Sequence, residues 1–151
     1  MLRSKNTLKP IIISDSINPL KSSKNPSLIK HFISQLKSDK LKKKNPNIDE
    51  LNNYIKEPSL LIIIGDFLGD FDFKTLSKKH EVFVIIIRDS FEESPHILGD
   101  KNFIDLPSGK NHNFFFGKRE LEEWKRGYEE NDKTLIAHLN SLGVGYLKIS
   151  N

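Results

Sequence analysis

The stretch "SLLIIIGDFLGD", residues 59–70, runs five consecutive branched apolar residues into a glycine and an aspartate, Asp66. The apolar half has no polar alternation, which is typical of a central parallel strand covered on both faces. Asp66 then follows where that strand ends. Aspartate commonly ends strands because it bonds to nearby backbone, so Asp66 is either a functional carboxylate or only the polar stop of a buried strand.

The rest of the chain alternates predicted strands with predicted helices. Apolar β-branched runs predict strands, apolar residues at helical spacing predict helices, and Pro and Gly mark the breaks. The predicted strands are 9–15, 59–66, 81–89 and 145–150, with two short strands within 90–117. The predicted helices are 27–41, 47–57, a short one within 71–80, and 118–142. This order favours an α/β fold, a mostly parallel open sheet with helices on both faces, and its length favours one domain over residues 1–151.

Composition excludes several kinds of protein. The chain has no cysteine, so disulfides, thiolate zinc sites and cysteine nucleophiles are ruled out. Its apolar runs are far shorter than the roughly 20 residues that span a bilayer, and we expect a cytoplasmic protein without a membrane segment.

Charge is unevenly distributed along the chain. Residues 1–45 carry 11 Lys or Arg against two Asp, a net charge of +9, and the other 106 residues carry 13 basic against 18 acidic residues, a net charge of −5. The lysines are interspersed with Ser and Asn, so we expect solvated surfaces there rather than a nucleic-acid site.

Three aspartates, Asp15, Asp66 and Asp89, end predicted strands, and Asp70 and Asp72 follow closely behind Asp66. In parallel sheets ligands bind outside the carboxyl ends of the strands, where such carboxylates could share one edge. Carboxylate oxygens suit Mg²⁺ or Ca²⁺. One hypothesis is therefore a small metal-dependent α/β hydrolase or phosphotransfer enzyme that uses these strand-end aspartates.

The usual catalytic motifs are absent from the sequence. "GDFLGDFD" has neither the dinucleotide fingerprint nor the lysine of a phosphate-binding loop, and no nucleophile elbow occurs. The five histidines lie at least 16 residues apart, so they form no local pair of metal ligands. These absences favour a protein that is not an enzyme.

Residues 59–149 resemble the carboxyl-terminal half of the bacterial domain of unknown function 58 family. The shared pattern is a strand ending in "GDF", a short helix leading to "HEV", a strand ending in "RD", and a long helix leading through "GV" to a short strand. Upstream, "PIIISDSINPL" is similar to the family's second strand. The resemblance implies a von Willebrand factor A-like, Rossmann-like fold and a MoxR-type AAA+ ATPase as partner.

In that fold a metal-ion-dependent adhesion site takes a DxSxS loop, a threonine and a later aspartate. Asp66 matches the later aspartate, and the resemblance makes it an Mg²⁺ ligand of an incomplete site. The serines are missing, since "DSINP" has Ile17 and Pro19 in their places, and Asn47 falls near the threonine position.

The resemblance also implies that the family's central first strand precedes residue 1, so we expect a fold incomplete at its amino terminus. An open sheet edge of that kind invites self-association. The favoured function is a non-enzymatic protein-interaction module of von Willebrand factor A-like type.

Overall fold

The computed structural model describes residues 7–13, 17–25, 27, 30–31, 34, 48–93, 95, 99–104 and 111–151, with the backbone alone for 99–104 and 111–116. The chain divides into two compact units, Met1–Asn47 and Ile48–Asn151. A single domain over residues 1–151 stays a prediction.

In the first unit, two short strands form an antiparallel pair. Strand β1 (Ile11–Ile13) pairs with β2 (Ile17–Pro19), and Ile12 lies opposite Asn18. The expected parallel strand over 9–15 is therefore wrong in its pairing, because Ile11–Ile13 pairs with the strand next in sequence in antiparallel register. Of the predicted helix over 27–41, the four residues that the structure describes are helical, and the others lie outside the described residues.

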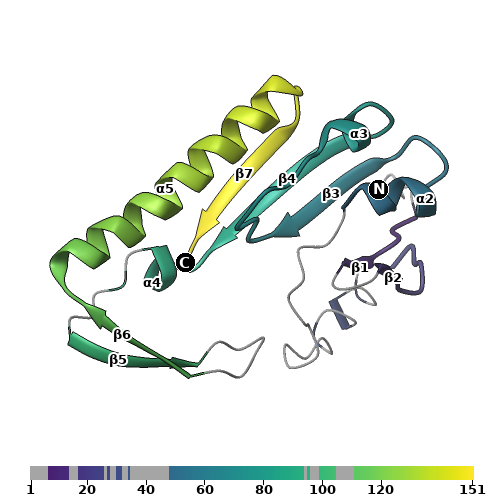
Figure 1. Ribbon diagram of the computed structural model, residues 1–151. Helices are drawn as coiled ribbons and strands as arrows, with labels where there is room; N and C mark the ends of the chain where they lie inside the picture. The colour runs from purple at the N-terminus through teal and green to yellow at the C-terminus, as the bar shows by residue number, and fades with distance from the viewer. Residues whose placement is uncertain are drawn as a thin grey trace. The chain divides into compact units, whose positions relative to one another are not determined.

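The second unit is built on a three-stranded parallel sheet. Its strands are β3 (Leu60–Gly65), β4 (Glu81–Arg88) and β7 (Gly145–Ser150), in the order β3-β4-β7. Figure 1 shows β4 between the other two. The three predicted strands of this part are thus confirmed, and all three carboxyl ends meet at one edge. The expectation that 59–66 is a central strand is wrong among the described strands, where β4 is central and β3 lies at the end of the order.

The remaining elements of this unit follow the predicted pattern closely. They are η2 (Ile48–Glu50), α2 (Leu51–Tyr54), α3 (Lys74–Ser77), α4 (Ser90–Glu93), the antiparallel strands β5 (Gly99–Ile104) and β6 (Asn111–Phe116), and α5 (Lys118–Ser141). Helix α5 ends where Gly143 adopts φ +66°, a left-handed conformation that favours glycine. Among the described elements of this unit, α4 alone has no counterpart in the sequence prediction.

The core lies on one face of the parallel sheet. Along β4, Val82, Val84, Ile86 and Arg88 are buried, and the residues between them are exposed or half-buried. The side chains with almost no exposed surface are Phe73, Leu76, Val84, Ile86 and Leu139. Helices α3 and α5 supply two of these, so both pack on the same face, and Figure 1 shows α5 running beside β7.

The opposite face of this sheet carries a set of apolar side chains that pack on none of the described helices. Its apolar side chains are Leu60, Ile62, Ile64, Phe83, Ile85, Ile87, Leu147 and Ile149, and all but the half-buried Ile85 are exposed. We call this set the open face. Within the described part of Ile48–Asn151, α3 and α5 pack on the other face, and helices on both faces of the sheet stay a prediction.

Candidate functional site

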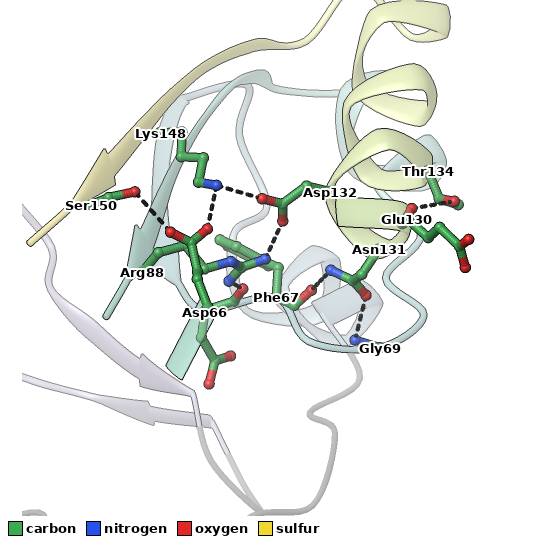
Figure 2. A network of polar contacts seen from close by, with 11 residues as sticks. Asp66, Phe67, Gly69, Arg88, Glu130, Asn131, Asp132, Thr134, Lys148 and Ser150 are labelled. Atoms are coloured by element: carbon green, nitrogen blue, oxygen red, sulfur yellow. Dashed lines mark hydrogen bonds and ion pairs between the residues drawn. The ribbon is translucent and has the colours of Figure 1, made fainter. Parts of the chain in front are cut away.

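The carboxyl edge of the sheet holds an ionic network in which Arg88 and Asp132 are buried and Lys148 and Glu93 are partly exposed. Arg88, at the end of β4, is only 2% exposed, and its guanidinium donates to an Asp132 carboxylate oxygen and to the backbone carbonyl of Asp66. Lys148 on β7 donates to the other Asp132 oxygen at 2.7 Å and also to Glu93. Figure 2 shows this network joining α5 to both strands.

The network sets the charge state of its members. Burial alone would raise the pKa of Asp132, but hydrogen bonds from Lys148 and Arg88 outweigh it, and the pKa lies below its ordinary value. For Lys148, burial would lower the pKa, but the hydrogen bonds to Asp132 and Glu93 raise it. Both groups are therefore held ionised, and the charge of the buried Asp132 is paired, as buried charges in proteins are.

Tyr128 on α5 closes the network on one side. Its ring centre lies 5.9 Å from the central carbon of the Arg88 guanidinium, within the range of a cation–π contact. Burial raises the pKa of the Tyr128 phenol, and the nearby carboxylate of Glu92 adds to the effect. The phenol therefore stays protonated at neutral pH.

The loop after β3 is held in a set conformation. Phe67 adopts φ +49°, which is unusual for a residue other than glycine, and its ring is buried against the rings of Phe71 and Phe73 at 5.3 and 5.8 Å. The Asn131 amide donates to the Phe67 carbonyl at 3.1 Å and accepts the Gly69 N–H at 3.2 Å. Packing and hydrogen bonds together stabilise a strained backbone at the edge where ligands bind in parallel sheets.

Asp66 sits between the network and this loop. Its carbonyl is used by Arg88, but its carboxylate is exposed and makes no hydrogen bond or ion pair with any residue that the structure describes. In Figure 2 the carboxylate has no dashed contact. Asp66 therefore lies exposed at the carboxyl edge, directly after β3, as the sequence predicted.

The other predicted site residues have local structural roles or are not brought together with Asp66. Asp89 accepts the Phe91 N–H at 2.9 Å and so caps α4, and Asp72 accepts the Lys74 N–H at 2.8 Å at the start of α3. Asp70 is exposed, and Asp15 lies outside the described residues. Among the described side chains, no three His, Asp or Glu residues form a group that could hold a metal ion. Mg²⁺ binding by Asp66 stays a prediction.

Sequence reasoning missed most of the network. Asp132 and Tyr128 share the α5 face of Leu135 and Leu139 at steps of three and four residues, so a carboxylate within an apolar stripe was the available signal. Lys148 and Glu93 carried no such signal. They lie 55 residues apart in sequence and meet only in the folded chain.

Comparison with family models, with curated proteins and with solved structures found no match to this chain. Among the described residues, the helices include none with the length and apolar character to cross a membrane.

Proposed function

We propose that this chain is a non-enzymatic protein-interaction module of von Willebrand factor A-like type, which acts in the cytoplasm and binds a partner at the carboxyl edge of its parallel sheet. The observation that carries the proposal is the display of Asp66, an exposed carboxylate with no partner among the described residues, directly before the held loop of Phe67 and Gly69. A loop that is already ordered loses little conformational entropy when it binds.

The neighbouring charged side chains are already paired with one another, which supports binding rather than catalysis. Arg88, Lys148, Asp132 and Glu93 neutralise one another, and Asp89 caps a helix. General acid–base catalysis needs a group that can exchange a proton at the pH of the reaction. The paired groups here are held ionised, which leaves Asp66 as a recognition charge.

The resemblance makes a MoxR-type AAA+ ATPase the expected partner. A carboxylate on a rigid surface recognises a basic group on such a partner, and removing a charge at the rim of an interface mainly slows association and reduces its dependence on salt.

The test is affinity capture from the source cells with the full chain as bait and identification by mass spectrometry. We expect a MoxR-type ATPase with the native protein, and a strongly reduced yield with Asp66→Asn. Glu81→Gln is the matched control, because it removes one exposed carboxylate from the amino end of β4, away from Asp66. Recovery of no ATPase, or equal recovery with both variants, would overturn the proposal.

A further inference from the structure

The open face is a second surface, separate from the carboxyl edge, and nothing in the proposed function uses it. It spans all three strands: Ile62 lies opposite Phe83, Ile85 opposite Leu147, and Ile87 opposite Ile149. Of its strand positions, only Glu81, at the amino end of β4, is charged. A continuous apolar surface of this kind marks an interaction site on a folded protein.

The exposed fractions on this face are large for such side chains. Leu60, Ile62 and Ile64 are 59%, 56% and 64% exposed, and Leu147 and Ile149 are 49% and 45% exposed. With Phe83 and Ile87 included, and at roughly 200 Å² for a fully exposed residue, the face offers about 700 Å², close to the roughly 800 Å² that each partner of a standard interface buries.

We propose that the open face binds a second copy of this chain, sheet against sheet, to form a two-fold dimer. A two-fold interface brings a patch against itself, so the patch must be complementary to itself. The centre of the open face meets this condition because it is apolar and uncharged, and a second copy brings no like charge against it. A partner that recognised this face by charge would find only Glu81 at its rim.

Packing geometry fits this arrangement. Two sheets pack face to face about 10 Å apart with interdigitating side chains, and α5, on the other face of each sheet, would lie outside. The open face is also uneven, so that the side chains of two copies can interdigitate. The Phe83 ring lies against Gly145, where an added Cβ would meet it at 2.8 Å, and a hollow of about 450 Å³ opens beside Leu60 and Ile62.

The first experiment measures mass by sedimentation velocity on the full chain between micromolar and several hundred micromolar. We expect a species of twice the 17.4 kDa chain mass, and a dissociation constant raised roughly 100-fold or more by Ile62→Lys, since each copy would then bury a charge at the interface. Glu122→Lys makes a charge change on the exposed side of α5 and should leave the dimer intact. Circular dichroism and thermal unfolding check that Ile62→Lys remains folded, as expected for a side chain that is 56% exposed.

The second experiment uses the absence of cysteine from the chain, so that one introduced thiol is unique. We expect Ile85→Cys, at the middle of the face, to form a disulfide-linked dimer on mild oxidation and to be protected from maleimide, whereas Glu122→Cys labels fully. A dimer that leaves Cys at position 85 freely labelled is joined elsewhere, for example through the β3 edge, and overturns the proposal. A monomer at the highest concentration overturns it as well, whether or not the thiol at position 85 is labelled. None of these outcomes bears on binding at Asp66, so failure here is distinct from failure of the proposed function.

Discussion

Arg88 on β4 and Asp132 on α5 form a buried ion pair whose side chains are 1% and 10% exposed. The pair joins the central strand of the parallel sheet to the helix that covers it. It also fixes the loop that follows β3, because the same guanidinium donates to the carbonyl of Asp66. Stability and the display of Asp66 are therefore coupled through one arginine.

Removing one member of this pair should be strongly destabilising. Asp132→Ala leaves the Arg88 charge buried, and we expect a loss of about 3–5 kcal/mol in the free energy of unfolding, measured by urea denaturation. Glu122→Ala, on the exposed side of the same helix, should change it by less than about 0.5 kcal/mol. The double variant Arg88→Met/Asp132→Leu should lose less than Asp132→Ala does. A cost below about 1 kcal/mol for Asp132→Ala would contradict a structural role for the pair.

The same network predicts a stability plateau bounded on both sides of neutral pH. The pKa of Asp132 is lowered on folding, so its contribution is present above the unfolded pKa, about 3.9, and is lost as pH falls through the folded value. The pKa of Lys148 is raised, so its contribution is present below the unfolded pKa, about 10.4, and is lost as pH rises through the folded value. Urea unfolding across pH measures both limits. Asp132→Asn should lose less unfolding free energy at acid pH than the native protein does. An unchanged loss at acid pH would show that other carboxylates cause it.

His80, at the amino end of β4, should make the fold sensitive to mild acid. It is 5% exposed, and neither ring nitrogen has a hydrogen-bond partner among the described residues. Burial and then the charge of Lys79 lower its pKa, so its neutral form is favoured on folding, and stability should fall as pH drops below the unfolded value of about 6.5.

The substitution His80→Met tests this effect. Because it removes two buried polar atoms without hydrogen bonds, it should be neutral or slightly stabilising at pH 7 and clearly stabilising at pH 5 relative to the native protein. His31→Gln, at an exposed position, is the control for general loss of a histidine. A His80→Met variant that is equally destabilised at both pH values would mean that the ring is needed for packing alone.

Mg²⁺ should have little effect on the thermal stability of this chain. Mg²⁺ requires near-octahedral oxygen ligands, and among the described residues no group of three His, Asp or Glu side chains could hold a metal ion. We therefore expect a Tm that changes by less than about 1 °C at millimolar Mg²⁺ or Mn²⁺, because a ligand raises Tm only when it binds the folded state. A larger rise that Asp66→Ala removes, and that Glu81→Ala leaves in place, would favour the metal-dependent enzyme instead.

The secondary structure of Ile48–Asn151 was largely predictable because it depends on local patterns. The runs at 60–64 and 82–87 are too rich in β-branched residues for a helix, and the α5 stripe has helical spacing. The pairing of Ile11–Ile13 was not predictable in this way, since an apolar strand has the same sequence in a parallel sheet and in an antiparallel pair.

Sequence could predict a residue of the candidate site only where its position follows from the end of a single strand. Asp66 could be placed because a polar residue after an apolar strand must lie at the sheet edge. Its environment could not, because Arg88, Asp132 and Lys148 meet only when β4, α5 and β7 have packed together.

For the stretch at 59–70, sequence alone determined that residues 60–64 form a strand and that Asp66 follows it at the carboxyl edge, because both depend on neighbouring residues. The tertiary structure decided that Ile63 is buried while Leu60, Ile62 and Ile64 are exposed, and that the Asp66 carbonyl, rather than its carboxylate, binds Arg88. A uniformly apolar strand is equally suited to burial on either side. Which side is covered depends on where α3 and α5 pack, and that is a property of the whole chain.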